Sequence, residues 1–366
     1  MRTLRVGIIG AGMAFERLHY PAYREMPDKY RIVAVCDEDR EKATMWAGRL
    51  GLEKGDTYSD HREMCKREDI DCFDIMVPIE KNYLVTEDVA RLAKKPIICE
   101  KPLAPDIQQA MAHRDLPKKY GIPIMIAENF RYNEEVDMIR DMVRTKKVGD
   151  IVYFMQNRVY YFPVDMHKNT FAATDWRQHP KYPGGTILDT TVHDMAALRH
   201  IFGAVDSLQA FGVPQDEDYS PYAVVNVNMK FKNGVTGQFS FYCSGMEIQR
   251  PLIGLRMFGT GGMIYLEDRD CGTINVTHND GGAERISYRP QRGFYNELLN
   301  FHNAAVGLEP ISVTPEMEFG DAMTVFAILD SIRQGSIIKV DRDTEYSPDY
   351  GAFREQPPVE NRPWLQ

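Results

Sequence analysis

The chain has 366 residues, of which 43% are hydrophobic and 27% charged, a composition typical of a globular protein too long for one compact core. Its formal net charge of −9, without a long basic run, argues against a nucleic-acid partner. No apolar run is long enough to cross a bilayer and the N-terminus has no signal-peptide pattern, so we expect a cytoplasmic protein with no membrane partner.

The first third of the chain alternates short apolar strands with helices. Strands are expected at residues 5–9, 31–36, 73–77, 96–99 and 122–127, and helices at 13–26, 40–50 and 83–94. This alternation is typical of a doubly wound parallel sheet. We therefore predict an α/β domain over residues 1–128.

The pattern changes after a helix expected over residues 134–146. Strand-like runs then follow one another at 151–161, 205–213, 223–231, 235–242, 252–258 and 263–266, with late helices at 294–305 and 316–333. Many of these strands alternate polar and apolar residues, so one face of their sheet is solvated or lies against a partner. We predict an α+β domain over 129–345 with an open, mostly antiparallel sheet, and an irregular tail over 346–366.

Two glycines, Gly10 and Gly12, separate the first strand from the first helix. The first permits a tight turn, and the second lets the backbone approach a pyrophosphate at the helix N-terminus. Asp37 ends the second strand, where a carboxylate binds the adenosine ribose and disfavours the extra phosphate of NADP. NAD is thus favoured, although Arg40 could accept that phosphate. In the alternative interpretation, the glycines form a plain turn and Asp37 caps the next helix.

A lysine follows the apolar strand at 96–99, in the segment Glu100-Lys101-Pro102. Proline cannot donate a ladder hydrogen bond, so the strand ends there. The amine of Lys101 is then held at the carboxyl edge of the parallel sheet, where open α/β folds bind ligands. The alternative is a solvated lysine at a strand end.

The segment Gly184-Gly185-Thr-Ile-Leu-Asp189-Thr-Thr-Val-His193 contains a second candidate pair. Asp189 and His193 are four residues apart and share one face if this segment is helical. A histidine oriented by a carboxylate can act as an acid or base near neutral pH. The spacing alone leaves open that Asp189 caps a helix and that His193 is a structural histidine.

Four motifs occur in the order Gly10-x-Gly12, Glu100-Lys101-Pro102, Asn129-Phe130-Arg131-Tyr132-Asn133 and Gly184-Gly185-(x)3-Asp189-(x)3-His193. Over nearly the whole chain up to about residue 340, the sequence resembles the glucose-fructose oxidoreductase/inositol dehydrogenase (Gfo/Idh/MocA) family. The resemblance implies an N-terminal Rossmann domain that binds NAD(P). It also implies an open C-terminal sheet that carries the substrate and forms homodimers or homotetramers. Lys101, Asp189 and His193 match the catalytic residues of that family.

Further candidates extend this site. The expected cofactor-binding residues are Gly10, Gly12, Met13, Ala14, Asp37, Arg40, Pro78, Glu100, Lys101 and Asn129. The expected substrate-binding residues are Lys101, Arg131, Tyr160, Trp176, Arg177, Asp189 and His193, since aromatic rings and arginines suit sugars. Two positions depart from the family pattern: Phe15 replaces a small residue, and Ile79 follows Pro78 where an asparagine is usual. The six cysteines show no zinc spacing, so we expect no metal.

We therefore predict an NAD(P)-dependent oxidoreductase that transfers hydride between the cofactor and a secondary hydroxyl of a carbohydrate substrate, such as a sugar, polyol or glycoside. In this hypothesis His193 accepts the hydroxyl proton and Lys101 stabilises the charge on the same oxygen. One alternative is a redox-neutral enzyme with tightly bound NAD, either a glycosidase or a sugar–sugar oxidoreductase. Another is a non-catalytic, nucleotide-sensing binding protein.

Overall fold

The computed structural model describes residues 2–340, which divide into two compact units. Among these residues, unit 1 contains residues 2–129 together with Gly293–Phe319, and unit 2 contains Phe130–Arg292 and residues 320–340. The first boundary lies one residue from the expected one. The return of Gly293–Phe319 to unit 1 differs from the expected continuous second domain, and the expected tail lies outside the described residues.

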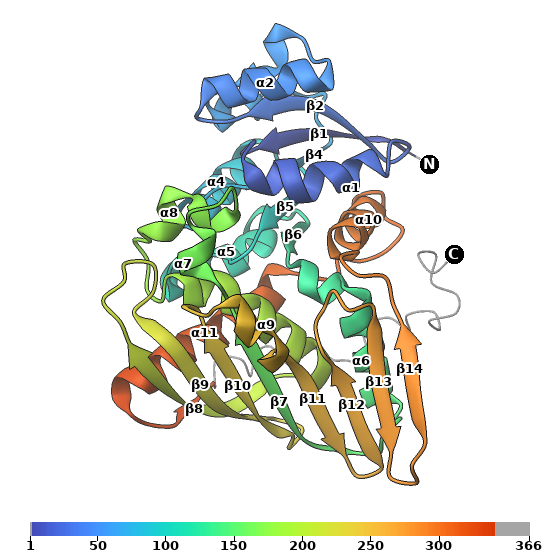
Figure 1. Cartoon of the computed structure of the whole chain (residues 1–366). Coiled ribbons are helices and arrows are strands. Elements are labelled where there is room, and N and C mark those ends of the chain that lie inside the picture. The colour runs from blue at the N-terminus through green and yellow to red at the C-terminus, as the bar shows by residue number, and fades with distance from the viewer. Residues whose placement is uncertain (1, 341–366) are drawn as a thin grey trace. The chain divides into compact units, whose positions relative to one another are not determined.

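Unit 1 is built on a six-stranded parallel sheet with the strand order β3-β2-β1-β4-β5-β6 (Figure 1). Its strands are β1 (Leu4–Ile9), β2 (Tyr30–Cys36), β3 (Thr57–Tyr58), β4 (Cys72–Ile75), β5 (Ile97–Glu100) and β6 (Ile124–Ala127). Its helical segments are η1 (Phe15–His19), α1 (Tyr20–Arg24), α2 (Arg40–Leu50), η2 (Lys54–Asp56), α3 (His61–Met64), α4 (Ile79–Leu92), α5 (Ile107–Tyr120) and α10 (Gly293–Ala305). The predicted doubly wound parallel sheet is confirmed.

Helix α5 was not expected from the sequence, because Pro117 interrupts its helical pattern. Its ends are nevertheless well defined: Asp106 accepts a hydrogen bond from the backbone N–H of Gln109 (2.8 Å), and Gly121 ends the helix at φ +67°. A proline in the last turn of a helix costs less than one in its middle, because fewer turns follow it. Capping at both ends supports the helix despite the proline.

The late segment Gly293–Phe319 belongs to unit 1 through long-range hydrogen bonds. The Tyr30 hydroxyl donates to the backbone oxygen of Leu298 (2.6 Å), and the Ile126 N–H donates to the backbone oxygen of Val313 (3.1 Å). Helix α10 also contacts α1 and β6. No local sequence pattern marks these contacts, which is why the expected domain boundary omitted this segment.

Unit 2 contains a nine-stranded sheet with the order β14-β13-β12-β11-β7-β10-β9-β8-β15. Its strands are β7 (Ile151–Val159), β8 (Val205–Pro214), β9 (Tyr222–Phe231), β10 (Thr236–Tyr242), β11 (Gly254–Gly259), β12 (Gly262–Leu266), β13 (Thr273–His278), β14 (Ala283–Ser287) and β15 (Ile338–Lys339). Only the β7–β10 pair is parallel among these described strands, which confirms the predicted mostly antiparallel sheet. Strands β13 and β14 were not expected.

Helices cover one face of this sheet. The helical segments are η3 (Asn129–Tyr132, at the boundary with unit 1), α6 (Glu134–Arg144), α7 (Phe162–Asp165), η4 (Phe171–Ala173), α8 (Asp175–Gln178), α9 (Thr186–Phe202), η5 (Glu247–Leu252) and α11 (Pro315–Gln334, shared with unit 1). The side chain of Gln156 on β7 donates to Asp194 on α9 (2.8 Å). The backbone N–H of Ala210 on β8 donates to Ser331 on α11 (2.9 Å).

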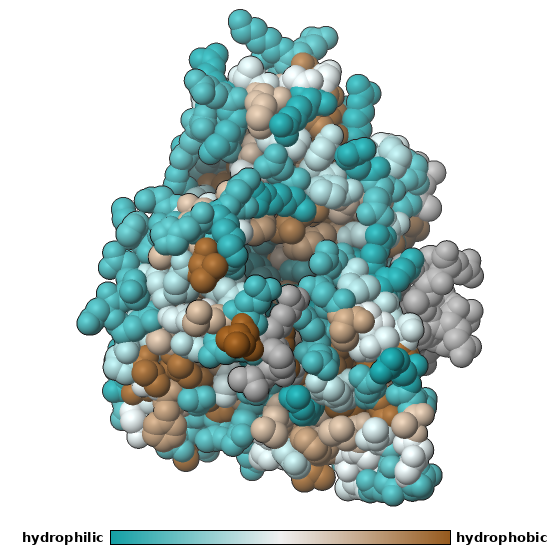
Figure 2. Space-filling model, viewed as in Figure 1, coloured by the Kyte–Doolittle hydropathy of each residue, from teal (hydrophilic) through white to brown (hydrophobic). Residues whose placement is uncertain are grey.

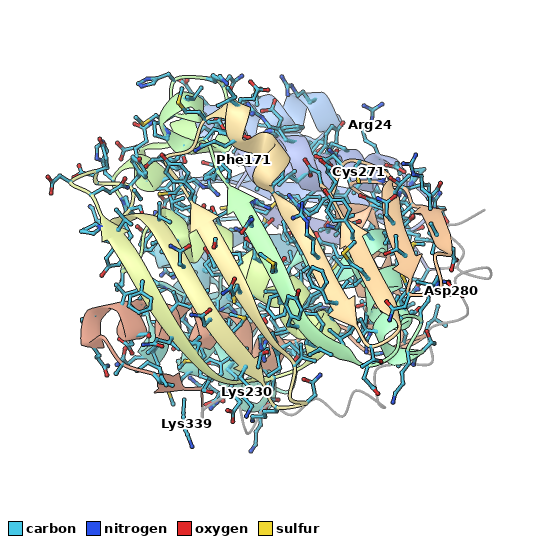
Figure 3. The ribbon with its side chains drawn as sticks, turned by 60° about the horizontal axis from the view of Figure 1, so that its bottom comes forward. Arg24, Phe171, Lys230, Cys271, Asp280 and Lys339 are labelled. Carbon is cyan, nitrogen blue, oxygen red and sulfur yellow. The ribbon has the colours of Figure 1, made fainter. Side chains whose placement is uncertain are left out.

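The opposite face of the sheet is turned toward the viewer in Figure 3, with the strands in front of the helices. Tyr153 and Phe258 stack there with ring centroids 4.3 Å apart, and Tyr153 and Met155 are exposed. On the side of the molecule drawn in Figure 2, most of the surface is hydrophilic and hydrophobic residues form separate small groups. Within residues 2–340, every helix is too short or too polar to span a bilayer.

Candidate active site

The glycine-rich turn after β1 has the geometry of a dinucleotide site. Gly10 has φ +92°, and a Cβ there would lie 2.1 Å from the backbone oxygen of Met76, so only glycine fits. A Cβ on Gly12 would meet nothing within 4 Å. The chain then turns helical at Met13 and Ala14. Gly12 thus leaves open space beside a helix N-terminus, which fits a bound pyrophosphate.

Phe15, which stands where the motif usually has a small residue, is fully buried. Its ring packs edge-on against Trp46 of α2, with centroids 4.7 Å apart. The Trp46 indole N–H in turn donates to the backbone oxygen of Ala11 (3.1 Å). The large side chain therefore supports the glycine turn from inside the unit and leaves the side of Gly12 open.

Asp37 fixes the same turn. One carboxylate oxygen accepts from the Ala11 N–H (2.8 Å) and the other from the Asp39 N–H (2.9 Å). Asp39, not Asp37, caps α2 by accepting from the Glu41 N–H (3.0 Å), so the helix-cap interpretation of Asp37 is wrong. Arg40 is exposed at the first position of α2.

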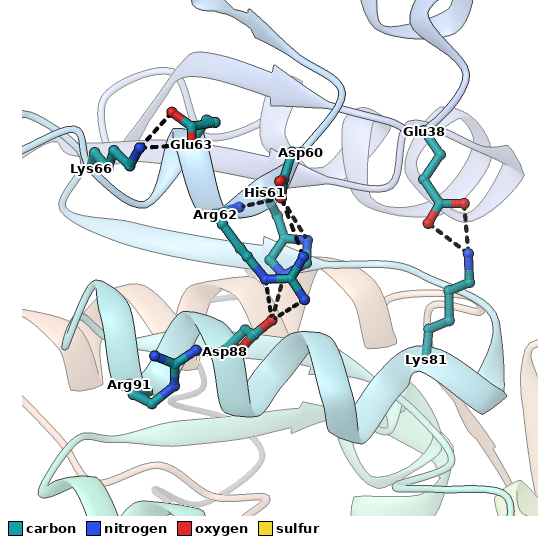
Figure 4. A network of polar contacts seen from close by, with 9 residues as sticks. All are labelled: Glu38, Asp60, His61, Arg62, Glu63, Lys66, Lys81, Asp88 and Arg91. Atoms are coloured by element: carbon teal, nitrogen blue, oxygen red, sulfur yellow. Dashed lines mark hydrogen bonds and ion pairs between the residues drawn. The ribbon is translucent and has the colours of Figure 1, made fainter.

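Figure 4 shows ion pairs that involve Glu38, next to Asp37, and residues of α3 and α4. The Lys81 ammonium donates to both carboxylate oxygens of Glu38 at 2.6 Å. Lys81 belongs to α4, which begins directly after Pro78, so the segment that departs from the family pattern is helical. Asp88 on the same helix binds Arg62 (2.8 Å) and Arg91 (2.7 Å) and links α3 to α4.

Three hydrogen bonds hold the backbone around Lys101. The Asn82 side chain donates to the backbone oxygens of Glu100 (2.9 Å) and Pro102 (2.7 Å), one on each side of the lysine. The Lys101 N–H donates to the Glu100 carboxylate (3.1 Å). Strand β5 ends at Glu100 as the sequence indicates, and Lys101 is half-buried. Asn129, which follows β6, is buried.

A buried cluster of acidic side chains surrounds His19 and includes Glu100, the residue before Lys101. The His19 imidazole contacts Asp74 through Nδ1 (2.8 Å) and Glu100 through Nε2 (3.1 Å). Burial alone would lower the pKa of His19, but Asp74 and Glu100 raise it well above its usual range. His19 is therefore an imidazolium that donates to both carboxylates and holds Glu100 against Lys101.

Glu297 of α10 is the third carboxyl group of this cluster. It is fully buried, 3.9 Å from His19 Nε2, and neither oxygen has a hydrogen-bond partner among the described residues. Burial raises the pKa of Glu297 well above its usual range; Glu100 adds to the rise and His19 opposes it. Burial and the lack of hydrogen-bond partners among the described residues thus favour the protonated, neutral form of Glu297. Sequence reasoning missed this cluster and Asn82, because no spacing pattern links residues this far apart.

In unit 2, Asp189 and His193 lie one turn apart on α9. The helix begins after Gly185, whose φ is +49° and whose Cβ would lie 2.2 Å from the backbone oxygen of Tyr219. Glycine is therefore required for the chain to enter this helix. Asp189 is buried and pairs with Arg177 Nε at 2.7 Å.

The His193 ring stacks on Phe130, with centroids 4.3 Å apart and an interplanar angle of 13°. This contact fixes the plane of the imidazole. Phe130 lies within the Asn-Phe-Arg-Tyr-Asn motif but was not among the predicted site residues. The motif itself was the available signal, although nothing in the sequence tells that the aromatic ring faces His193.

The other expected substrate residues differ in their surroundings. Arg131 is buried and binds Asp321 (2.6 and 2.7 Å), which also pairs with Arg199, so we assign it a structural role. Burial raises the pKa of Tyr160 to about 12. The Arg177 guanidinium lies 3.9 Å from the centre of the Trp176 ring. Trp176, Arg177 and Asp189 thus form one contiguous group.

The site residues occur in a chain that matches two family models. Residues 4–128 match the oxidoreductase family with an NAD-binding Rossmann fold, and residues 136–265 match the GFO/IDH/MocA C-terminal domain. The chain belongs to this family. The predicted recognition and the NAD cofactor are confirmed, and unit 1 carries the NAD-binding Rossmann domain of a GFO/IDH/MocA oxidoreductase.

Individual relatives are distant. The chain is 28% identical to the Saccharomyces cerevisiae protein YMR315W over 93% of this chain and all of that protein. It is 28% identical to a levoglucosan dehydrogenase of Pseudarthrobacter phenanthrenivorans over 79% of this chain and 80% of that one. A solved levoglucosan dehydrogenase in complex with NADH and levoglucosan has a TM-score of 0.81 at 22% identity, covering 93% of this chain and 100% of that one. The structural likeness establishes the shared fold.

Proposed function

We propose that this GFO/IDH/MocA oxidoreductase is an NAD-dependent dehydrogenase of a secondary hydroxyl on a sugar, polyol or glycoside. The observation that carries the proposal is the arrangement on α9, where Asp189 and His193 lie one turn apart and His193 stacks on Phe130. An imidazole with a fixed plane beside a buried ion pair is suited to proton transfer. Dehydrogenase names among the relatives support the reaction class.

The cofactor would be held by the glycine turn and the strand ends of unit 1. The backbone of Gly12, Met13 and Ala14 would bind the pyrophosphate, and Asp37 would accept from the ribose hydroxyls. Asp37 already accepts one backbone hydrogen bond on each oxygen, but a carboxylate oxygen can accept a second. Glu38 is paired with Lys81, so the carboxylate of Asp37 is the group that favours NAD over NADP. When bound, the nicotinamide supplies the acceptor for the hydride.

The remaining candidate cofactor-binding residues lie at the ends of strands or at the start of α2. Pro78, Glu100, Lys101 and Asn129 follow or end strands β4, β5 and β6, and Arg40 begins α2. Ligands in open α/β folds bind at the carboxyl ends of the strands. In this structure Glu100 already holds His19 and the Lys101 N–H, so we assign it the role of anchoring the lysine.

In the proposed reaction, His193 takes the proton of the substrate hydroxyl as the carbonyl forms. Lys101 donates a hydrogen bond to the same oxygen and stabilises the developing negative charge. Asp189, paired with Arg177, keeps a negative charge one turn from His193 and favours the protonated imidazole that follows proton transfer. Proton transfer by a positioned group contributes about 10²–10⁴-fold to rate.

The test is NADH formation by the purified protein with NAD⁺ or NADP⁺ against free sugars, inositols and glycosides. Lys101→Met should abolish the activity found, whereas Lys118→Met, at an exposed position of α5, should not change it. Reduction by one substrate class that is lost only in Lys101→Met supports the proposal. If no substrate reduces either nucleotide and denatured protein releases nicotinamide, a redox-neutral enzyme with trapped NAD replaces it. Protein without nucleotide or turnover would point to the sensor hypothesis.

We also propose that the uncovered face of the nine-stranded sheet forms a homodimer or homotetramer. Tyr153, Met155 and Phe211 expose apolar surface on the sheet strands. Burial of such surface between copies would be favourable. Sedimentation of wild-type protein and of Tyr153→Asp tests this proposal. A smaller species in the variant is expected, and an unchanged oligomer or a monomeric wild type would contradict it.

A further inference from the structure

An arginine lies on the aromatic ring that supports His193. The guanidinium carbon of Arg269 is 3.7 Å from the centre of the Phe130 ring, and the His193 ring stacks on the same phenyl ring at 4.3 Å. Each group covers one face of the ring, so the two lie on opposite sides, roughly 8 Å apart by the sum of two stacking distances. Arg158 is a second cation near this ring, at 5.9 Å.

The turn that carries Arg269 is fixed by the fold. It connects β12 to β13, and the buried Tyr288 hydroxyl lies 3.0 Å from the backbone oxygen of Asp268 and 2.6 Å from that of Arg269. The Cys271 N–H also donates to the Asp268 oxygen (3.3 Å). Arg269 is only partly exposed. These contacts hold the backbone of Arg269 and so limit where its guanidinium can lie.

Arg269 differs from the other arginines of this region in its charge partners. Arg177 pairs with Asp189, and Arg131 pairs with Asp321. Among residues 2–340, no carboxylate lies within 4.0 Å of the Arg269 side-chain nitrogens, and its side chain has no hydrogen bond to a described residue. Burial, with the field of Arg158, lowers the pKa of Arg269 to about 10, so the group remains a cation at neutral pH.

The acids nearest to Arg269 do not neutralise it by contact. Glu135 is buried, its Oε2 has no hydrogen-bond partner among described residues, and burial raises its pKa to about 7. Asp270 is exposed and accepts from Gln291 (3.2 Å). Asp194 accepts from Gln156. A partly buried guanidinium without a contacting carboxylate costs free energy that a bound anion would recover.

We propose that Arg269 binds a carboxylate or phosphate group of the substrate, so that the oxidised sugar is an anionic one such as a hexuronate or a sugar phosphate. A planar guanidinium forms two parallel hydrogen bonds with either group. The separation from His193 places the anionic group several bonds away from the reacting carbon. This proposal rests on the proposed dehydrogenase function and adds the substrate class.

The kinetic test compares D-glucuronate, D-galacturonate and D-glucose 6-phosphate with D-glucose and D-galactose, using NAD⁺. Wild type should prefer at least one anionic sugar over its neutral counterpart. Arg269→Gln should raise KM for that anion about 10–100-fold, the range for one charge-assisted contact, with little change in kcat. Arg269→Lys should recover part of the loss. Arg285→Gln, at an exposed position of β14, should behave as wild type.

A binding experiment separates this proposal from the dehydrogenase proposal. Calorimetric titration of D-glucuronate or D-glucose 6-phosphate into the NADH complex requires no turnover, and binding lost in Arg269→Gln supports the anion site even if no sugar is oxidised. Equal effects of the variant on neutral and anionic sugars would overturn it. So would weaker NADH binding in Arg269→Gln, because the guanidinium would then serve the cofactor pyrophosphate. A wild-type enzyme that prefers neutral sugars would also overturn it.

Discussion

The charged groups next to Lys101 and those around His193 differ in how the protein compensates their charges. In unit 1, three buried carboxyl groups surround one imidazole, and their charge is partly compensated within the protein, by His19 between Asp74 and Glu100 and by burial that favours the protonated form of Glu297. In unit 2, two guanidinium groups lie near Phe130, and Arg269 has no ion-pair partner among the described residues.

This difference distinguishes groups that position a catalytic side chain from groups that bind the substrate. A cluster whose hydrogen bonds are made within the protein fixes geometry, as the chain of contacts from Asp74 through His19 and Glu100 to the Lys101 backbone does. A cation such as Arg269, which has no ion-pair partner among residues 2–340, can use its hydrogen bonds for a ligand. We therefore assign the unit 1 cluster to holding Lys101 and the Phe130 stack with Arg269 to binding substrate.

The largest expected effect is at the proton acceptor. His193→Ala should lower kcat by about 10²–10⁴, the contribution of a positioned general base. The matched control is His167→Ala, because His167 is exposed in the same unit. Stopped-flow detection of NADH with a saturating substrate measures the effect. Turnover unchanged in His193→Ala would remove His193 from the mechanism.

The next effect tests how the unit 1 cluster is neutralised. His19→Phe leaves Asp74 and Glu100 buried without their cation and should destabilise the protein by about 3–5 kcal/mol in denaturant unfolding. Glu297→Gln replaces a neutral acid and should change the free energy of unfolding by less than about 1 kcal/mol. A large loss of stability in Glu297→Gln together with a small loss in His19→Phe would contradict this assignment, because Glu297 would then be ionised and His19 neutral.

The pH dependence of stability tests the buried acid near Arg269. The pKa of Glu135 is raised from 4.5 to about 7, so the folded protein holds a proton that the unfolded chain releases above pH 4.5. This contribution is complete below pH 4.5 and is lost as pH rises to about 7, with a total of about 3 kcal/mol. Glu135→Gln should remove the decline over that pH range in denaturant unfolding. An identical decline in the variant would assign it to other groups.

A smaller effect is expected from the ring between His193 and Arg269. Phe130→Leu keeps a buried apolar side chain but loses the stacked ring, worth about 0.5–1.5 kcal/mol. We expect kcat/KM to fall roughly 2- to 10-fold by the same energy. Phe130→Tyr keeps the ring and should retain more activity. Equal activity in Phe130→Leu and wild type would show that the stack does not orient His193.

Much of the fold could be predicted, because it depends on local patterns. Alternating apolar strands and helices predicted the parallel sheet, and helix 40–50 agrees at both ends because Asp39 and Gly51 are strong local signals. Helix α5 was missed because of Pro117, and β14 because most of its residues are exposed. Strand β13 alternates polar and apolar residues and buries Ile274 and Val276, so its pattern was present in the sequence and went unrecognised. The segment Gly293–Phe319 belongs to unit 1 through contacts such as that of Tyr30 with Leu298, which no local sequence pattern predicts.

The candidate site could be predicted where a motif carries it, and less so where it depends on tertiary contacts. Lys101, Asp189 and His193 came from motifs, and their assignment as catalytic residues stays a prediction. Arg131 looked like a substrate residue because arginine suits sugars, but burial pairs it with Asp321. His19 and Arg269 belong to no spacing pattern. The importance of His19 follows from the carboxylates around it, and that of Arg269 from the lack of a contacting carboxylate among the described residues.

The most direct test of the account is a double-mutant cycle between Lys101 and His193, with single-turnover NADH formation as the readout. In the proposed reaction both residues act on one substrate oxygen, and groups that act as a unit show strongly non-additive losses. Lys101→Met combined with His193→Ala should therefore cost little more than the more damaging single change. Losses that multiply would contradict the account, because the lysine and the histidine would then act in independent steps.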